Sequence, residues 1–172
     1  MKAVLKAGII LIACALASME SAVAQPANLG CSSEWSGTVQ TLHCGGGVTI
    51  VAESGAGYTL LDRGHKGRVD GVELNSKAVL IEVPAKPGGN KFQVITPQAI
   101  AAVRGTKWAV DAAEARTSVL VVNGRVSVGP RAGSQGVTLG PGEGVDVEAG
   151  APLTVKRWAP ARVSALMARL GQ

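Results

Sequence analysis

The cysteines carry the most distinctive chemistry in this sequence. Cys31 and Cys44 lie close to each other in the chain, and His43 directly precedes the second of them. These three side chains could be imagined as zinc ligands, but no CxxC or HxxxH pair accompanies them and a fourth ligand is not evident. A pair of cysteines in an exported chain instead favours a disulfide. We therefore predict a Cys31–Cys44 bridge and no metal site.

Side chains that could act together as nucleophile and base are sparse. The two histidines are His43 and His65, and His65 lies in a glycine-flanked turn where a solvated imidazole is the usual outcome. No Gly-x-Ser-x-Gly elbow, HExxH helix or P-loop is present. Asp146 and Glu148 share one face of a predicted strand and could hold a cation, although such a pair more often lies on the solvent-exposed face of a sheet. We predict no catalytic residues, no cofactor and no enzyme activity.

The first residues have the three parts of a secretory signal peptide. Lys2 and Lys6 are followed by an apolar run over residues 7–17, and Ala22-Val23-Ala24 supplies the small residues that a signal peptidase recognises. The apolar run is far shorter than the ~20 residues that a membrane-spanning helix requires. We expect cleavage after Ala24, no stable membrane span afterwards, and a periplasmic location in a Gram-negative bacterium.

One stretch of this leader allows an alternative. Leu11-Ile12-Ala13-Cys14 has the shape of a lipoprotein cleavage box, which would place an acyl anchor on Cys14. The apolar run continues beyond Cys14, and the stretch before it is unusually short. We therefore favour Cys14 as a small apolar residue of the signal peptide, whose removal leaves an even pair of cysteines.

The number and distribution of charged residues limit the kinds of partner that the protein can bind. The chain has 17 Lys and Arg against 12 Asp and Glu, a formal net charge of +5. The positive residues are scattered along the sequence, with no run longer than Lys156-Arg157, whereas a nucleic-acid site requires a clustered patch. We predict no nucleic-acid partner. Loose attraction to anionic envelope polymers or lipid head groups is compatible with this charge, but an ordinary solvated surface is favoured.

Most of the remaining chain predicts β-structure. Short runs of Val, Ile, Leu and Thr alternate with Gly, Pro, Asn and Asp, which is typical of many short strands joined by tight turns. The predicted strands are Val48 to Glu53, Tyr58 to Asp62, Gly71 to Leu74, Ala78 to Val83, Phe92 to Thr96, Ala99 to Val103, Trp108 to Ala112, Ser118 to Val122, Val126 to Val128, Val137 to Leu139 and Val145 to Val147. Such a set predicts an all-β fold, either a twisted sandwich or a solenoid-like stack.

Two local signals stand out within this pattern. Asn123-Gly124 lies between two alternating apolar runs, which predicts a two-residue type I′ hairpin. Pro160 suits the first turn of a short amphipathic helix that Gly171 ends. Its apolar residues recur at helical spacing and are Val163, Leu166, Met167 and Leu170. A terminal helix of this kind usually covers a core, and partner binding is the alternative.

Four elements in the second half of the chain carry a family resemblance. They are an apolar-Thr-Pro element ending at Thr96-Pro97, Gly105-Thr106 followed by Trp108 and alternating apolar residues, a V-x-x-G-x-V-x-V hairpin around Gly124, and an L-x-x-G-E turn ending at Gly142-Glu143. In this order and at this spacing, they make the chain from Phe92 to Val147 resemble the FecR domain family. The segment from Gly71 to Val83 looks like the strand pair that normally precedes this core.

The resemblance implies a periplasmic, mainly β, non-enzymatic domain used in protein interaction and envelope signalling. The best-known members are iron-uptake regulators that sense an occupied outer-membrane receptor and pass its state through one membrane helix to a cytoplasmic sigma factor. This sequence shows a cleavable signal in place of a cytoplasmic segment and a spanning helix. We therefore expect a free-standing secreted form that lacks the transmembrane relay, and we carry over location and interaction rather than iron regulation.

The motif residues are best explained as structural. The turn glycines, which need positive φ, are Gly105, Gly124 and Gly142. The hydroxyl of Thr106 can bond a turn backbone, and Pro97 can fix an edge or a corner. Trp108 is expected to bury its ring between layers, with its indole N–H paired at the rim.

Arg104 and Glu143 lie beside two of these turns. One hypothesis is that they pair and hold the turns together. The alternative is two solvated charges, and an exposed pair contributes only ~0–1 kcal/mol.

We divide the chain into four parts. These are a signal peptide (1–24), an N-terminal segment with the disulfide (25–46), a FecR-like β domain (47–158) and a C-terminal helix (159–172).

Two functions remain open. The first is an interaction or sensor module for an unidentified periplasmic or outer-membrane protein. The second is an envelope protein that binds peptidoglycan or another polysaccharide. Exposed Trp35 and Tyr58 would favour the second, because sugars stack on accessible aromatic faces. A buried Trp35 and an apolar strip along a sheet edge would favour the first.

The leader makes a prediction that mass spectrometry of the protein, exported from a Gram-negative host, can check. Signal peptidase should leave a mature chain that begins at Gln25, because the small residues before it fit the peptidase site. A chain that begins at an acylated Cys14 would contradict this prediction and make the protein a lipoprotein.

Overall fold

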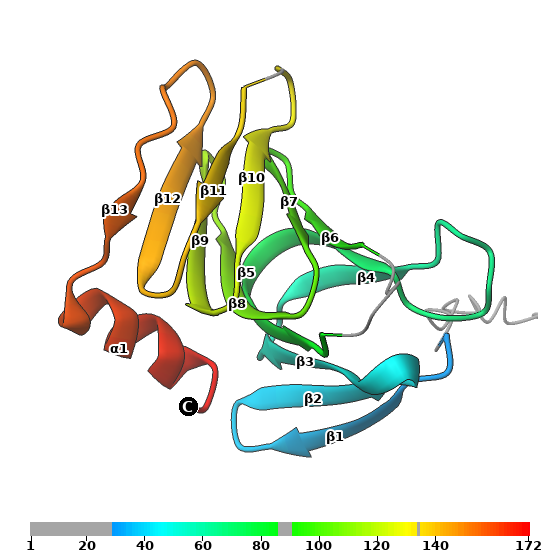
Figure 1. Ribbon diagram of the computed structural model, residues 1–172. Coiled ribbons are helices and arrows are strands. Elements are labelled where there is room, and N and C mark those ends of the chain that lie inside the picture. The colour runs from blue at the N-terminus through cyan, green and yellow to red at the C-terminus, as the bar shows by residue number, and fades with distance from the viewer. Residues whose placement is uncertain (1–28, 86–90, 134) are drawn as a thin grey trace, which may run out of the picture.

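A computed structural model describes residues 29–85, 91–133 and 135–172, so the predicted cleavage site and Cys14 lie outside the described residues. Within them the protein is mostly β, as predicted, and ends in helix α1 (Pro160–Arg169) (Figure 1). None of the helical segments in these ranges is long and apolar enough to cross a membrane.

The strands form one curled sheet whose two halves face each other, here called sheet A and sheet B (Figure 1). Sheet A has the order β1 (Ser32–Ser36), β2 (Val39–Cys44), β3 (Val48–Glu53), the second part of β5 (Gly71–Val83), β8 (Thr106–Ala112), β9 (Arg116–Asn123), β12 (Glu143–Glu148) and β13 (Lys156–Arg157). Sheet B has the order β4 (Gly57–Leu61), the first part of β5, β6 (Phe92–Ile95), β7 (Ala99–Val103), β10 (Val126–Pro130) and β11 (Val137–Leu139). Neighbouring strands are antiparallel except β5 and β6, which are parallel. A 3-10 turn at Gly45–Gly47 joins β2 to β3.

Strand β5 replaces the two separate strands that the sequence predicts between residues 71 and 83. Its first part pairs with β4 and β6, and its second part pairs with β3 and β8. The strand turns from one sheet into the other near Lys77, which has a φ of 63° and donates from its ammonium group to the carbonyl oxygen of Ser54. Backbone pairing continues through the bend because β5 changes neighbours there.

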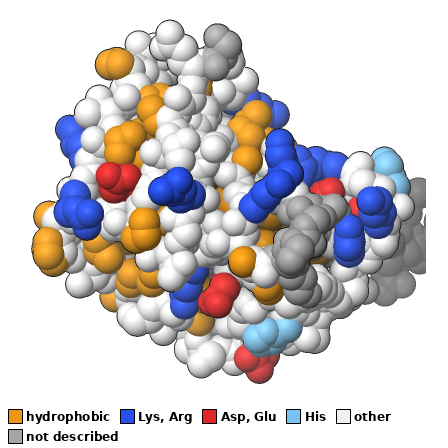
Figure 2. Space-filling view, viewed as in Figure 1, with side chains coloured by type: hydrophobic (Ala, Val, Ile, Leu, Met, Phe, Trp, Pro, Cys, Tyr) orange, Lys and Arg blue, Asp and Glu red, His pale blue; other side chains and the backbone are white. Residues whose placement is uncertain are grey.

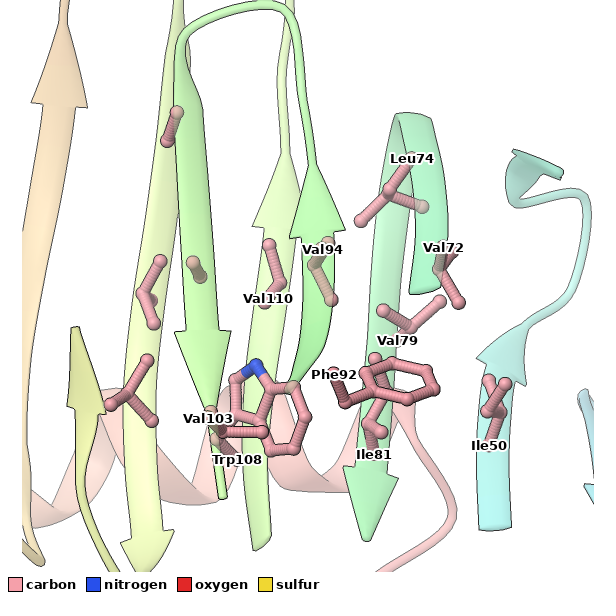
Figure 3. Packing of buried hydrophobic residues seen from close by; sticks show 14 of the residues in the cluster. Ile50, Val72, Leu74, Val79, Ile81, Phe92, Val94, Val103, Trp108 and Val110 are labelled. Carbon is pink, nitrogen blue, oxygen red and sulfur yellow. The ribbon is translucent and has the colours of Figure 1, made fainter. Parts of the chain in front are cut away.

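The space between the two sheets is filled by small branched side chains and two aromatic rings. On the surface viewed in Figure 2, hydrophobic side chains form small separate groups, while the side chains of the core are enclosed between the sheets (Figure 3). The rings of Phe92 and Trp108 meet edge to face, with centroids 5.9 Å apart. Trp108 is fully buried, as expected, but its Nε1 has no hydrogen-bond partner, so the predicted pairing at the rim is wrong. The ring lies too deep among apolar side chains to reach an acceptor, at a cost of about 1–3 kcal/mol.

The Asn123-Gly124 turn is a corner between the two sheets, and the predicted type I′ hairpin is wrong. Strand β9 pairs with β8 and β12, whereas β10 pairs with β7 and β11. Gly124 has a φ of 87°, and a Cβ there would lie 2.8 Å from the carbonyl oxygen of Gly105 in the neighbouring corner. The hydroxyl of Thr106 donates to the carbonyl oxygen of Arg125 at 3.1 Å and joins the two corners. Close packing of the corners therefore requires glycine here.

The N-terminal segment forms a hairpin that extends sheet A. Strands β1 and β2, which the sequence pattern does not predict, pair from Ser32 opposite His43 to Ser36 opposite Val39. The predicted disulfide is confirmed, with 2.06 Å between the sulfur atoms of Cys31 and Cys44. The bridge closes the open end of this hairpin.

Helix α1 covers the outer face of sheet A, so its apolar side packs on a core. Leu166, Leu170 and the ring of Trp158 form a second buried cluster with apolar side chains of the sheet, namely Ala78, Leu80, Ala109 and Leu120. Gly144 has no side chain, which lets the Trp158 ring lie against β12. The two cores therefore lie on opposite sides of one sheet.

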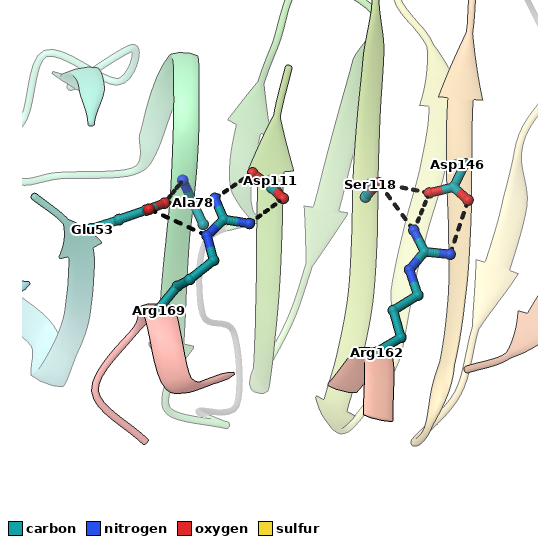
Figure 4. Close-up of polar contacts among 7 residues, drawn as sticks. All are labelled: Glu53, Ala78, Asp111, Ser118, Asp146, Arg162 and Arg169. Carbon is teal, nitrogen blue, oxygen red and sulfur yellow. Dashed lines mark hydrogen bonds and ion pairs between the residues drawn. The ribbon is translucent and has the colours of Figure 1, made fainter. Parts of the chain in front are cut away.

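Two arginines fix the helix to the sheet (Figure 4). Arg169 donates to Asp111 at 2.7 and 3.1 Å and to Glu53 at 2.7 and 3.2 Å. The second oxygen of Glu53 also accepts a bond from the backbone N–H of Ala78 at 3.1 Å. These hydrogen bonds raise the pKa of the Arg169 guanidinium above its usual value. Arg169 thus links α1 to β3 and β8, and Glu53 extends the link to β5.

Arg162 is the second of these arginines. Its guanidinium donates to both oxygens of Asp146, at 2.5 and 3.0 Å, and lies 3.5 Å from the centre of the Trp158 ring. Ser118 donates to the same carboxylate at 2.6 Å. Burial alone would raise the pKa of Asp146, but the hydrogen bonds from Arg162 and Ser118 lower it below its ordinary value.

Asp146→Asn should therefore destabilise the fold in a pH-dependent way. A carboxyl with a lowered folded-state pKa stabilises fully above its unfolded pKa and loses that contribution as pH falls through the folded value. We expect a loss of roughly 1 kcal/mol at neutral pH, because the pair is partly exposed, and a smaller loss below about pH 4. Urea unfolding of parent and variant at neutral pH and below about pH 4 measures these losses in the free energy of unfolding. An equal loss at the two pH values would contradict the stabilising role of the ionised Asp146 carboxylate.

Cys44→Ala should lower the melting temperature in non-reducing buffer. In the chain-entropy model, the loop between Cys31 and Cys44 gives a stabilisation of about 3 kcal/mol. Calorimetry with and without reductant checks this, since reductant should lower the stability of the parent and leave the variant unchanged. An unchanged melting temperature in the variant would show that the bridge does not stabilise the fold.

Candidate functional site

The threonine of the Thr96-Pro97 element links the two sheets. The Thr96 hydroxyl accepts from the N–H of Ala99 at 2.8 Å and lies 2.7 Å from the hydroxyl of Thr117 in β9. Thr117 in turn donates to the side-chain oxygen of Gln98 at 2.9 Å. Both threonines are buried, and Pro97 is exposed in the turn beside them. This polar bridge closes one end of the core.

Arg104 and Glu143 do not pair. Glu143 closes its own turn, because its carboxylate accepts from the N–H of Gly140 at 2.7 Å. Arg104 is exposed at the corner after β7, and no ion pair joins it to any residue that the structure describes. Gly142, in the same turn as Glu143, has a φ of 77°. The hypothesis that this pair locks two turns together is therefore wrong.

The residues with the greatest chemical reactivity are spread over the surface. His43 is exposed and lies 3.5 Å from Glu34, and His65 is in the exposed loop between β4 and β5. Asp146 and Glu148 share one strand, but both oxygens of Asp146 are bound by Arg162. Among the described residues, no three His, Cys, Asp or Glu side chains gather where they could hold a metal ion.

The free edge of sheet A is a different kind of candidate. Strand β1 pairs only with β2, and all five of its residues are exposed (Figure 1). Hydrogen-bonded and non-hydrogen-bonded pairs alternate in an antiparallel ladder, and the second kind has the shorter Cα separation of about 4.5 Å. The Cα atoms of Cys31 and Cys44 are 4.1 Å apart, which places this pair in the second kind. By alternation, Ser33 and Trp35 direct their backbone N–H and C=O groups away from β2.

Trp35 makes this edge chemically distinct. Its side chain is 63% exposed, and it stands directly opposite Gln40 on β2, so the two side chains share a face. The oxygen of the Gln40 amide accepts a 2.8 Å bond from the hydroxyl of Tyr58, which lies half-buried on β4. Burial raises the pKa of the Tyr58 hydroxyl above its ordinary value. The indole of Trp35 therefore lies on the same face as an amide that links β2 of sheet A to the phenol of Tyr58 on β4 of sheet B.

Sequence reasoning singled out Trp35 and Tyr58 but missed the edge strand that presents Trp35. The segment Ser32–Ser36 has no alternation of apolar and polar residues, since neither of its faces is buried. The one local signal is Gly37, whose φ of 58° makes the two-residue turn into β2.

Comparison with known proteins relates the fold to one family. The FecR family, described as FecR protein, matches residues 45–127. No curated protein matches the sequence.

Two crystal structures, each of a candidate anti-sigma factor from Parabacteroides distasonis, share the fold. One has a TM-score of 0.62 and 21% identity over 80% of this chain and 63% of its own. The other has a TM-score of 0.61 and 20% identity, with coverage of 80% and 64%. This chain thus spans less than two thirds of the length of either protein. The family match runs from the turn before β3 to the start of β10, and over residues 45–127 this protein is a FecR domain.

Proposed function

We propose that this protein is a non-catalytic protein-interaction module of periplasmic envelope signalling, whose partner adds an extended segment to strand β1, next to the FecR domain. The observation that carries the proposal is the pair of outward-facing residues on β1. Ser33 and Trp35 together offer two N–H and two C=O groups, the pattern that a bound strand requires.

The composition of β1 supports this use of the edge. Natural proteins usually protect a free edge with lysine, proline, a bulge or a covering loop. Strand β1 reads Ser-Ser-Glu-Trp-Ser, pairs with β2 in unbroken register, and carries a large exposed indole. The disulfide at its open end and the turn at Gly37 hold the hairpin together, so binding would order little additional chain.

The comparisons and the leader support the signalling and location parts of the proposal. The domain is of the FecR family, and the structures with the same fold come from candidate anti-sigma factors. Residues 1–24 have the pattern of an export signal, and a disulfide suits an oxidising compartment.

Trp35 is exposed, which is the outcome expected for a second function, the binding of peptidoglycan or another polysaccharide, although Tyr58 is only half-exposed. An accessible indole offers a flat apolar face on which a sugar ring can stack. The amide of Gln40 and the hydroxyl of Tyr58 lie beside it as hydrogen-bonding groups. In this alternative the side chains at the edge bind the ligand, and the outward backbone groups of β1 do not.

Ser33→Pro separates the two functions, because proline removes one outward N–H donor of β1 while an edge strand tolerates its ring. We expect the variant to recover about fivefold less of the protein partner from envelope extracts than the parent does, because one backbone hydrogen bond between β1 and the added strand is lost. Ser33→Ala keeps the N–H and is the matched control, which should bind like the parent. Mass spectrometry of the captured proteins gives the measurement.

Trp35→Ala completes the design. Strand addition predicts that Ser33→Pro and Trp35→Ala both lose the same captured protein, and that neither changes sedimentation with purified peptidoglycan. Polysaccharide binding predicts sedimentation that Trp35→Ala abolishes and Ser33→Pro leaves intact. Equal capture by all three variants would contradict the role of β1.

A further inference from the structure

Three basic residues from distant parts of the chain line up at one end of sheet B. Phe92 of β6 and Val126 of β10 both stand opposite Val103 of β7. One residue beyond these partners, where the three strands have ended, continuing the same register would bring Lys91, Arg104 and Arg125 next to one another. We call these three residues the basic row.

The basic row has an electrostatic cost that the fold itself does not explain. Neighbouring strands are about 4.8 Å apart, and like charges directly opposite each other destabilise a sheet. All three side chains are exposed, and none forms a hydrogen bond or an ion pair within the part of the chain that the structure describes. Asp70, which lines a pocket together with Lys91, is bound by Arg63. Glu143 and Glu82 are engaged with the N–H of Gly140 and with Lys107.

Three other arginines in the protein are used differently. Arg63, Arg162 and Arg169 each bind a carboxylate at 3.1 Å or less, and they hold loops or the helix in place. Arg104 and Arg125 contribute no such contact. Their backbones are nevertheless held firmly, because the corners at Gly105 and Gly124 pack against each other and Thr106 bonds the carbonyl oxygen of Arg125. Arg104 and Arg125 are therefore unpaired cations on a well-held backbone.

We propose that the basic row binds a phosphate group. At about 4.8 Å per strand, Lys91 and Arg125 start about 10 Å apart on either side of Arg104, and these long side chains can converge on one compact, multiply charged anion. Two of them are arginines, whose planar guanidinium matches phosphate oxygens with paired hydrogen bonds. Lys and Arg side chains are also more prominent than acidic ones on the face viewed in Figure 2. This site is separate from β1 and does not depend on the function proposed for that edge.

Titration with tripolyphosphate tests the site, using the full exported chain at low ionic strength. Arg104→Gln and Arg125→Gln should each weaken binding by about five- to tenfold, because each removes a charge-assisted contact. Arg116→Gln removes the same charge from the opposite end of β9 and is the matched control, with an expected change of less than about twofold. The two row variants should melt no lower than the parent, since they relieve repulsion between like charges.

Vesicles distinguish the sources of the phosphate. Co-sedimentation with vesicles of phosphatidylcholine and phosphatidylglycerol, but not of phosphatidylcholine alone, would assign the row to a lipid headgroup, provided that the row variants abolish it. Binding of tripolyphosphate without vesicle binding would assign it to a free or polymeric phosphate. Absence of binding to both probes, an equal effect of Arg116→Gln, or tighter binding of a polyglutamate peptide than of either phosphate probe would overturn the proposal.

Discussion

The architecture depends on one strand that belongs to both halves of the sheet. Strand β5 is the only described strand with neighbours in sheet A and in sheet B, so it fixes how the halves face each other. The positions of β5 that face the core shift at this bend. Before it they are the even-numbered Val72 and Leu74, and after it they are the odd-numbered Val79 and Ile81. The positive φ of Lys77 is the local cost of this change of direction. A strand ended at residue 74 would leave two separate sheets.

The other features follow from this curl. Because the two halves lie close together, the chain must pass between them at narrow corners, and Gly105 and Gly124 pack where any Cβ would collide. The core has room for branched aliphatic side chains and only two aromatic rings, which explains the low aromatic content. The outer face of sheet A stays apolar at its centre, so α1 has to cover it. Arg162 and Arg169 bind the helix at two places along its length.

Sequence periodicity predicted those strands whose two faces differ in burial. The bounds of β3, β7 and β11 match their apolar runs, and α1 begins at Pro160 as its helical spacing indicates. The hairpin at Asn123-Gly124 failed because a turn signal is local: it reports a reversal of the chain but not which strands pair across it. The pairing of β9 and β10 with other strands is set by the distant β5 bend.

The candidate sites were harder to predict because they arise from register. Strand β1 is polar on both faces, so no alternation marks it, although Trp35 was recognised as a residue that would decide the function. Lys91, Arg104 and Arg125 look scattered in the sequence, and only the pairing of β6, β7 and β10 brings them into one row. The expected Arg104–Glu143 ion pair assumed that side chains of two neighbouring turns bind each other. The Glu143 carboxylate instead accepts a hydrogen bond from the N–H of Gly140 in its own turn.

Site-specific cross-linking in living cells tests the central claim, that β1 is the contact surface, most directly. A photoreactive residue in place of Ser36 on β1 would be compared with one in place of Ala168, which is exposed on α1. The account predicts that light produces one discrete cross-linked protein from position 36, and none from position 168. Cross-links from position 168 alone, or products from position 36 that contain glycan and no protein, would contradict it.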